Sequence, residues 1–316
     1  MKLINHFIER LVIFDMGKVY DGIMGLVVGD ALGVPFEFRK RDTFKATEMT
    51  GYGTYNQPIG TWSDDTSLTL ATLESLYLCK ELNLCDIMNR FKNWLYHGVY
   101  TPYGEVFDIG RTTRAAIIKY ATNPFILPEL CGGLSVMDNG NGSLMRILPL
   151  AFTNCTMEDV FNVSSLTHAH DISKTACGIY FNIAQYLLKG EEKHEAVESA
   201  LSKSGGVPAE FERLEVINTS PVRREEIKSS GFVIDTLEAA LWCFLTTDSY
   251  RECVLTAVNL GEDTDTIAAI AGGLAGIYYG TGGEKSIPEE WIDQIAQKEW
   301  FKELCEAFER QIASGE

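Results

Sequence analysis

The sequence predicts an all-α protein that folds as one compact domain. Helical periods of apolar residues recur along most of the 316 residues, and we find no run of the polar–apolar alternation that is typical of strands. The chain is 46% hydrophobic, which is enough for one large core, and its 22% of charged residues is not the composition of a disordered protein. Length alone would permit one or two domains. We expect a single domain over residues 1–316.

The expected helices follow the apolar periods in chain order. The first, over residues 19–32, carries Gly25 and Gly29, which let another backbone approach closely at some cost in helix propensity. The others are expected at residues 64–83, 84–96, 112–120, 143–152, 157–168, 172–189, 192–202, 232–245, 249–260 and 267–280, and at 288–312 as one or two helices. The expected loops are 39–59, 98–110, 123–142 and 204–230. The last loop is polar, and it is either a mobile lid or a solvated surface segment.

The net charge and the cysteines of the sequence limit which binding partners and which cellular compartment we expect. The formal net charge is −17 and no basic run is present, so the sequence disfavours nucleic acid as a partner. The eight cysteines form no Cys-x-x-Cys pair, which predicts free thiols in the reducing cytoplasm. Charged residues interrupt 1–18, which lacks the core of a signal peptide, and the longest apolar run, 267–280, is shorter than the roughly 20 residues that span a bilayer. We therefore expect a cytoplasmic protein with no membrane partner.

An acidic stretch at residues 261–266, Gly-Glu-Asp-Thr-Asp-Thr, directly precedes the apolar run 267–280. Asp263 and Asp265 are two residues apart, so they would diverge on a helix but can converge on an irregular entry turn. Burying two carboxylates against an apolar helix is costly unless a cation neutralises them, and hard oxygen ligands suit Mg²⁺, Mn²⁺ or Ca²⁺. The alternative is an ordinary helix start, capped by threonine and stabilised by acidic residues near the macrodipole.

A second acidic stretch has the same chemistry. Residues 60–66, Gly-Thr-Trp-Ser-Asp-Asp-Thr, place Ser63, Asp64 and Asp65 at the start of another apolar helical run. If the two helix starts face each other, their hydroxyls and carboxylates can hold two divalent ions from opposite sides. A paired-metal site is the hypothesis that follows.

Three further segments carry candidate binding residues. Glu37 follows a turn at Pro35, on a loop from which a carboxylate can reach a substrate, although most such glutamates are simply exposed. The Asn-Gly-Asn-Gly-Ser segment at 139–143 can hold a phosphate with its backbone N–H groups at a helix start, and a plain tight connection is the alternative. His168 and His170 are two apart with no cysteine near, which disfavours zinc, so one histidine that contacts a substrate fits better.

Taken together and in this order, the motifs resemble the ADP-ribosylglycohydrolase family. The resemblance covers about residues 19–280, and the C-terminal helices expected at 288–312 lie beyond it. The matching segments are the Gly-Asp-x-x-Gly segment that ends at Glu37, and residues 62–66, 107–110, 140–146, 166–168, 230–242 and 263–266. Each segment is weak evidence alone, whereas their combination is specific.

The resemblance implies an all-α fold that binds two divalent cations, Mg²⁺ or Mn²⁺. The matching metal ligands are Ser63, Asp64, Asp65, Asp263, Asp265 and Thr266. The expected catalytic residues are Glu37, Asp64 and Asp265. The expected contacts with ADP-ribose come from Asp108, Gly140, Asn141, Gly142, Ser143, His168 and Phe232. Ser63 stands where the family often has threonine, and either residue supplies a hydroxyl oxygen.

The chemistry of the residues and the resemblance both predict hydrolysis of a glycosidic bond to ADP-ribose. Two cations can coordinate the ribose hydroxyls and position water, while Glu37 assists proton transfer. The expected substrate is an ADP-ribosylated protein, with an arginine linkage favoured, or a small ADP-ribosyl conjugate, and ADP-ribose is the product. Serine, acetyl-ester and nucleic-acid linkages stay open. The alternative functions are an ADP-ribose-binding protein without turnover and a metal-dependent nucleotide pyrophosphohydrolase.

Overall fold

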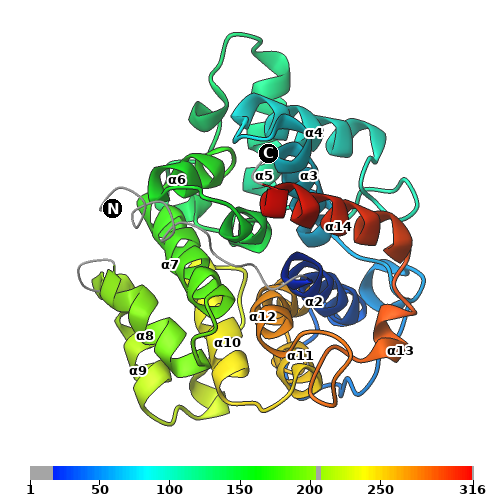
Figure 1. The fold of residues 1–316 in the computed structure, drawn as a ribbon, viewed down its shortest axis with the longest axis vertical. Helices are drawn as coiled ribbons and strands as arrows, with labels where there is room; N and C mark the ends of the chain where they lie inside the picture. The colour runs from blue at the N-terminus through cyan, green and yellow to red at the C-terminus, as the bar shows by residue number, and fades with distance from the viewer. Residues whose placement is uncertain (1–16, 204–207, 315–316) are drawn as a thin grey trace, which may run out of the picture.

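Two apolar helices at the centre of the molecule organise the fold. They are α2 (Lys18–Gly33) and α12 (Thr264–Tyr279), which lie side by side in Figure 1. The computed structural model describes residues 17–203 and 208–314. Nearly all residues of both helices are buried, as expected for helices that are apolar on every face. The pair therefore forms the core on which the other helices pack.

Glycine lets the two central backbones touch. A Cβ atom added to Gly29 would lie 2.1 Å from the carbonyl oxygen of Ala268, and one added to Gly33 would lie 2.2 Å from the Cα atom of Asp265. The small residues of the first helix thus have the role that the sequence predicts for them. These contacts join the carboxyl end of α2 to the amino end of α12, so the helices are antiparallel. Glu37, which follows α2, is thereby brought to the start of α12.

The remaining helices cover the central pair from two sides. On one side, α3 and α14 pack against α2, with α4 and α5 stacked beyond α3 (Figure 1). Their bounds are α3 (Asp64–Cys79), α4 (Leu84–His97), α5 (Arg111–Thr122), α13 (Glu289–Ile292) and α14 (Lys298–Ser314). On the other side, α7, α10 and α11 pack against α12. The helices here are α6 (Met157–Ser165), α7 (Asp171–Leu188), α8 (Lys193–Lys203), α9 (Glu212–Thr219), α10 (Val233–Leu245) and α11 (Tyr250–Val258).

Short 3₁₀ turns connect the helices, and among the described residues β structure is limited to isolated bridges. The turns are η1 (Val34–Phe36), η2 (Gly53–Tyr55), η3 (Pro128–Leu130), η4 (Val136–Asp138), η5 (Leu144–Arg146), η6 (Leu148–Phe152), η7 (Ala209–Phe211) and η8 (Arg224–Glu226). The predicted all-α fold is therefore confirmed.

Two expected helices have different bounds in the structure. The helix expected at 143–152 is instead the two 3₁₀ turns η5 and η6, because Pro149 lacks an N–H group and disfavours the α conformation in the residue before it. The helix expected at 64–83 ends at Cys79, where Lys80 takes a left-handed conformation with a φ of 60°. In both segments, apolar residues continue the helical pattern of the sequence, but they are not part of an α-helix in the structure.

The segment expected to be a loop at 204–230 contains the helix α9. Leu214 and Ile217 of this helix are buried against the fold, so the described part of the segment is not simply a solvated excursion. Residues 204–207 lie outside the described residues, as do residues 1–16, on which the expectation of no signal peptide rests.

Helix α2 and the turn η1 together span Lys18–Phe36, which is long and apolar enough to cross a membrane by length and composition. From the sequence we expected the longest apolar run at 267–280, so this segment was not among the membrane-length candidates. The fold buries 89% of the membrane-length window, so we interpret it as a core helix. All eight cysteines are free thiols, as predicted.

Candidate functional site

The carboxylates singled out in the sequence lie around one cavity where α2, α3 and α12 meet. The cavity has a volume of about 310 Å³. Its lining includes Glu37, Asp64, Asp108, Gly140, Asn141, Gly142, His168, Asp263 and Thr266. A larger hollow of about 720 Å³ lies at the far end of α12, beside Tyr278 and Tyr279, and its lining includes none of these residues.

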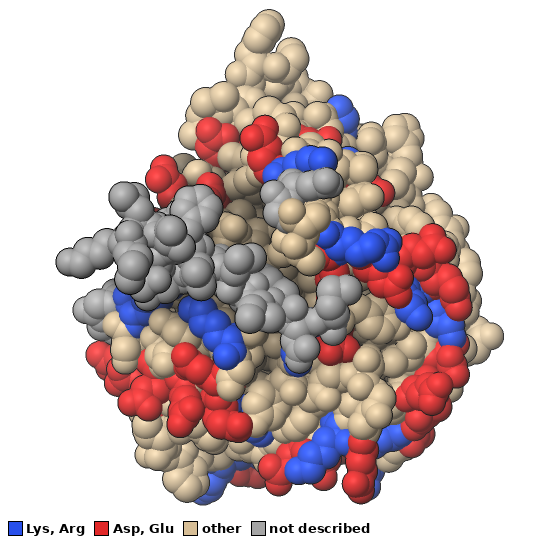
Figure 2. Space-filling view, viewed as in Figure 1, with Lys and Arg blue, Asp and Glu red and all other residues tan. Residues whose placement is uncertain are grey.

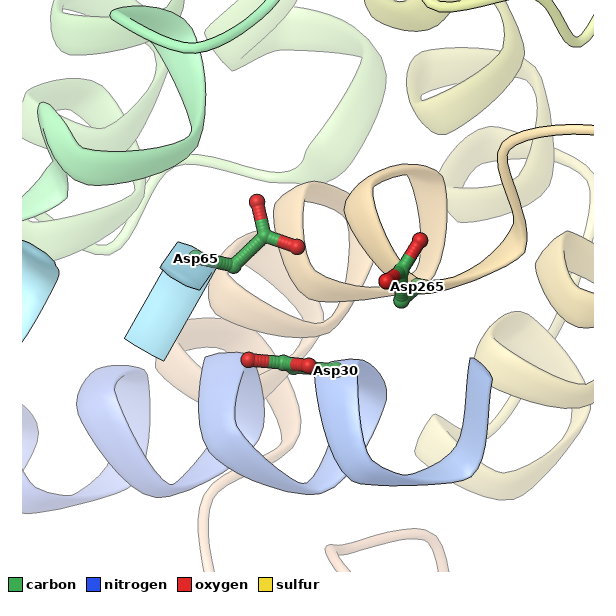
Figure 3. A group of neighbouring side chains, drawn as sticks. All are labelled: Asp30, Asp65 and Asp265. Carbon is green, nitrogen blue, oxygen red and sulfur yellow. The ribbon is translucent and has the colours of Figure 1, made fainter. Parts of the chain in front are cut away.

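Three buried aspartates form an inner carboxylate cluster (Figure 3). Asp30 lies near the end of α2, Asp65 in the first turn of α3 and Asp265 in the first turn of α12. One oxygen of each lies within 4.8 Å of the others. Burial raises the pKa of Asp30 to about 6, and it raises the pKa values of Asp65 and Asp265 well above their usual range, with repulsion from neighbouring carboxylates adding to both.

Asp30 is a site residue that the sequence analysis did not identify. Its carboxylate accepts hydrogen bonds from the backbone N–H groups of Ser63 and Thr66, each at 3.0 Å, and from the Thr66 hydroxyl at 2.6 Å. Asp30 therefore caps the amino end of α3 from another helix and positions Asp65. The signal that could have revealed it is an aspartate within an otherwise apolar helix, where burial requires partners.

Glu37, Asp108 and Asp265 form an outer carboxylate cluster, again with one oxygen of each within 4.8 Å of the others. Glu37 follows η1 and is only 5% exposed. Asp108 has a left-handed backbone with a φ of 53°, a conformation that is uncommon for residues other than glycine but that aspartate tolerates. Because Asp265 belongs to both clusters, the inner and outer carboxylates form one continuous acidic site.

Tyr55 supports the outer cluster, and the sequence analysis missed it within the loop expected at 39–59. Its hydroxyl donates a hydrogen bond to Oδ1 of Asp108 at 2.6 Å, and its ring lies 4.9 Å from that of Phe107. Burial and the charge of Asp108 raise the pKa of Glu37 to about 9, while a hydrogen bond with Tyr55 acts in the opposite direction. One tyrosine thus contacts Glu37 and Asp108, two of the three outer carboxylates, although its local sequence carries no signal of this role.

The donor atoms fit a pair of hard divalent cations. Within the two clusters, three buried carboxylate oxygens have no hydrogen-bond partner among the described residues, namely Oε2 of Glu37, Oδ1 of Asp65 and Oδ2 of Asp265. An unpaired buried carboxylate is costly, so these oxygens require a proton or a cation. Both clusters consist of carboxylates without cysteine or histidine, which suits Mg²⁺ or Mn²⁺. Two clusters that share one aspartate suit two ions.

The other expected metal ligands surround the same clusters. Asp64, Asp263 and Thr266 line the cavity. The Ser63 hydroxyl accepts a hydrogen bond from the backbone N–H of Asp65 at 3.2 Å, so it also caps α3. Burial raises the pKa of Asp263 to about 6 and raises that of Asp64 well above its usual range. The fold thus brings the two acidic stretches together, whereas direct coordination by each residue stays a prediction.

The segment 139–143 forms one wall of the cavity. The side-chain amide of Asn141 donates to Oδ2 of Asp263 at 2.8 Å, which ties this wall to the acidic site. Ser143 differs from the expectation, because its side chain is fully buried and its hydroxyl accepts from that of Ser164 at 3.0 Å instead of facing the cavity. The N–H of Asn141 donates to the carbonyl oxygen of Gly231 at 3.1 Å, and the turn η5 that follows has only three residues and no long helix dipole. The expected contact of this wall with a diphosphate stays a prediction.

Phe232 lies beside the cavity and is not part of its lining. Gly231 lines the cavity instead, while the Phe232 side chain is 37% exposed. The backbone of Phe232 forms an isolated bridge with Gly140, so it helps to position the wall. The expected contact of this ring with ADP-ribose stays a prediction.

His168 lines the cavity as a neutral imidazole. The Thr167 hydroxyl accepts a hydrogen bond from the buried guanidinium of Arg146 at 2.8 Å and forms a second hydrogen bond with Nδ1 of His168, also at 2.8 Å. Nε2 of His168 lies near Gly140 and Gly142 in the wall. Burial, with the charge of Arg146, lowers the pKa of His168 to about 3, which keeps the ring neutral.

Known proteins resemble this chain over nearly its whole length. The family model for ADP-ribosylglycohydrolase matches residues 14–316. The ADP-ribosylarginine hydrolase Tri1 of Serratia proteamaculans (strain 568) is 32% identical over 296 residues, which cover 92% of this chain and 78% of the relative. The ADP-ribosyl-[dinitrogen reductase] glycohydrolase of Rhodospirillum rubrum is 30% identical over 291 residues, which cover 89% of this chain and 91% of the relative.

The fold matches as well. A solved structure described as an ADP-ribosylglycohydrolase-related protein complex superposes with a TM-score of 0.78 at 30% identity, and the match covers 93% of this chain and 97% of the other. Sequence, fold and the acidic cavity thus agree, and the protein belongs to the ADP-ribosylglycohydrolase family.

Proposed function

We propose that this protein is a metal-dependent hydrolase that cleaves the glycosidic bond between ADP-ribose and an arginine side chain of a protein. The products would be free ADP-ribose and the restored arginine. The observation that carries the proposal is the pair of carboxylate clusters that share Asp265, set against the Gly-rich wall at 140–142 in one cavity. The wall suits a diphosphate, and the carboxylates suit cations and a cationic leaving group.

The carboxylates of both clusters would hold two Mg²⁺ or Mn²⁺ ions. Asp65 and Asp265 offer oxygens that have no other partner, and Glu37 offers a third from the outer cluster. When bound, such ions neutralise the carboxylates, orient the ribose hydroxyls and supply an activated water. Asp30 is occupied with the α3 backbone, so its part is to place Asp65 correctly.

Two lines of support favour arginine as the modified side chain. The relative from Serratia proteamaculans is named for ADP-ribosylarginine, and it covers 92% of this chain. In the outer cluster, Glu37 and Asp108 place carboxyl oxygens side by side, and such paired acceptors match the several N–H donors of a guanidinium group better than a single hydroxyl. Arginine therefore fits the cavity better than serine does.

Glu37 and His168 would act directly on the substrate. The pKa of Glu37 is raised to about 9, so this carboxyl can hold and release a proton near neutral pH beside the breaking bond. His168 stays neutral and would form a hydrogen bond with the substrate in the cavity. The side-chain amide of Asn141 donates a hydrogen bond to Asp263 and so holds the wall beside the acidic site.

The test is a substrate panel with and without metal. ADP-ribosylarginine, ADP-ribosylserine, O-acetyl-ADP-ribose and ADP-ribosylated nucleic acid are incubated with Mg²⁺ or Mn²⁺, and the released nucleotides are separated by chromatography. We expect ADP-ribose from the arginine conjugate at the highest kcat/KM, no turnover in excess chelator, and recovery on adding metal. Release of AMP would instead show a pyrophosphohydrolase, binding of ADP-ribose without any product would show a binding protein, and faster cleavage of another linkage would refute arginine.

A further inference from the structure

Large apolar side chains are exposed on one segment beside the cavity. They are Phe125, Leu127, Leu130, Leu134, Val136 and Met137, which together we call the apolar rim. Phe125 is 93% exposed and Met137 is 77% exposed. The segment between α5 and η5 forms the projection at the top of Figure 1, and the outer end of this projection shows no charged atoms in Figure 2. The rim is thus an apolar surface without a covering partner among the described residues.

Backbone hydrogen bonds fix the base of the apolar rim. The N–H of Gly132 donates to the carbonyl oxygen of Ser165 at 3.0 Å, and that of Gly133 donates to Thr167 at 2.9 Å. In return, the N–H of Ala169 donates to the carbonyl oxygen of Gly133 at 2.8 Å. A capping box closes the turn η4 within the rim. The rim is therefore a structured surface, and its exposure does not come from an unanchored loop.

The apolar rim is continuous with the wall of the cavity. The hydrogen bonds at its base hold Thr167 and Ala169, the two neighbours of His168, which lines the cavity. Met137 precedes Gly140 of the wall by three residues, so their Cα atoms are at most roughly 11 Å apart. A molecule that fills the cavity and extends out of it on this side passes over the rim.

Charged side chains do not explain how the apolar rim would bind another molecule. Residues 123–137 contain one charged side chain, Glu129, in a protein whose net charge is −17. The rim can therefore gain binding free energy only by removing apolar surface from water. Exposed apolar patches of this kind mark surfaces that bind other proteins or ligands.

We propose that the apolar rim docks the folded protein that carries the ADP-ribosyl group. The proposal rests on the proposed function, because it takes the occupant of the cavity to be a side chain of that carrier. A cavity of about 310 Å³ is far too small for a folded protein, so the body of the carrier lies outside, against the surface around the cavity. The rim is an exposed apolar part of that surface, next to the wall of the cavity.

The test compares a protein substrate with a small one on the same variants. The rim variant carries Leu134→Ser and Met137→Gln, and the matched control carries Leu78→Gln and Val216→Gln, which are also exposed apolar positions. The substrates are two unrelated folded proteins mono-ADP-ribosylated on arginine, and free ADP-ribosylarginine. We expect the rim variant to raise KM for the protein substrates about tenfold, with kcat/KM for ADP-ribosylarginine within twofold of wild type. The control should match wild type on every substrate.

Three results would overturn the docking proposal. They are an unchanged KM for both protein substrates, an equal loss on ADP-ribosylarginine, and a wild-type dimer in sedimentation that the rim variant converts to monomer, since the rim would then join two copies of this chain. Failure of wild type to cleave ADP-ribosylarginine would refute the proposed function instead. In that case, anisotropy binding of the two labelled modified proteins still reports whether the rim variant weakens docking.

Discussion

The inner and outer carboxylate clusters share Asp265 but differ in how the protein uses their oxygens. In the inner cluster, Asp30 is fully buried, and its carboxylate oxygens accept hydrogen bonds from the backbone of α3 and of Ser63 before it. In the outer cluster, Glu37 keeps one oxygen without a partner, and Asp108 is held by a single tyrosine hydroxyl on a left-handed backbone. The inner cluster is built into the core, whereas the outer cluster faces the cavity.

Within one acidic site, some carboxylates therefore mainly hold the fold together, whereas others mainly face the cavity where the reaction takes place. A change at Asp30 of the inner cluster should disturb both folding and metal binding, because its carboxylate joins α2 to α3. A change at Glu37 or Asp108 of the outer cluster should affect turnover with little effect on folding, because both residues sit on connecting segments outside the α-helices.

The largest effect is expected at the shared residue. Asp265→Asn removes a carboxylate charge from both clusters while keeping the shape of the side chain, so we expect kcat/KM to fall by roughly 10⁴-fold, with helical circular dichroism retained. Added metal should raise the melting temperature of this variant less than it raises that of wild type. The matched control is Asp171→Asn, which makes the same change in the exposed first turn of α7 and should keep wild-type activity. Full turnover of Asp265→Asn would remove this residue from the metal site.

The next effect separates catalysis from binding in the outer cluster. Glu37→Gln keeps the size of the side chain but removes the basic carboxylate, so we expect kcat to fall on the order of 10²–10⁴-fold, as for a lost general acid or base. Calorimetry should show near-normal ADP-ribose binding, because the wall at 139–143 is unchanged. Single-turnover kinetics supply the rate, and near-normal turnover would exclude Glu37 from the mechanism.

In the inner cluster, Asp30→Asn should reduce stability and metal affinity together. The amide can accept fewer of the hydrogen bonds from Ser63 and Thr66, so we expect the free energy of unfolding in chelator to fall by about 1–2 kcal/mol. Displacement of Asp65 should weaken metal binding by about 10–100-fold. Urea unfolding and a metal titration followed by calorimetry measure the two effects. Lost metal binding with unchanged stability would mean that Asp30 acts as a ligand only.

A smaller effect is expected at Tyr55. Tyr55→Phe removes the hydroxyl that holds Asp108 at 2.6 Å but keeps the packing of the ring on Phe107. We expect kcat to fall by about tenfold with unchanged unfolding free energy, since the lost bond orients a group at the cavity and not in the core. Tyr103→Phe, at an exposed tyrosine, is the control. Unfolding at lower urea would show that Tyr55 is structural.

The smallest effect concerns pH and metal. The pKa values of Asp30 and Asp263 are raised to about 6, and that of Glu37 to about 9, so the metal-free folded state binds more protons than the unfolded state. Stability from these groups is full below about pH 4 and is lost as pH rises through 6 and then 9. In chelator, the melting temperature should fall by several degrees between pH 5 and 9. Saturating Mg²⁺ or Mn²⁺ should remove most of this fall. Identical pH profiles with and without metal would contradict the account.

Local patterns in the sequence were enough to predict the helices and the types of side chain at the site. Apolar periods and small residues follow from helix geometry, so α2 and α12 were expected before their contact was known. Acidic residues with hydroxyls at two helix starts indicated hard cations because carboxylates are costly to bury unpaired. Two departures from the apolar pattern have local causes: Pro149 lies where 3₁₀ turns replace the expected helix at 143–152, and the left-handed Lys80 ends α3 at Cys79.

The sequence by itself determined which residues could hold metal and phosphate, since that depends on the chemistry of each side chain and its neighbours. Only the tertiary structure decided that Asp30 caps α3, that Tyr55 contacts the outer carboxylates and that Ser143 turns into the core. These relations join residues that lie tens of positions apart, and no local period or motif encodes them. Glycine brings α2 and α12 into backbone contact, which places Asp30 and Glu37 beside the start of α12.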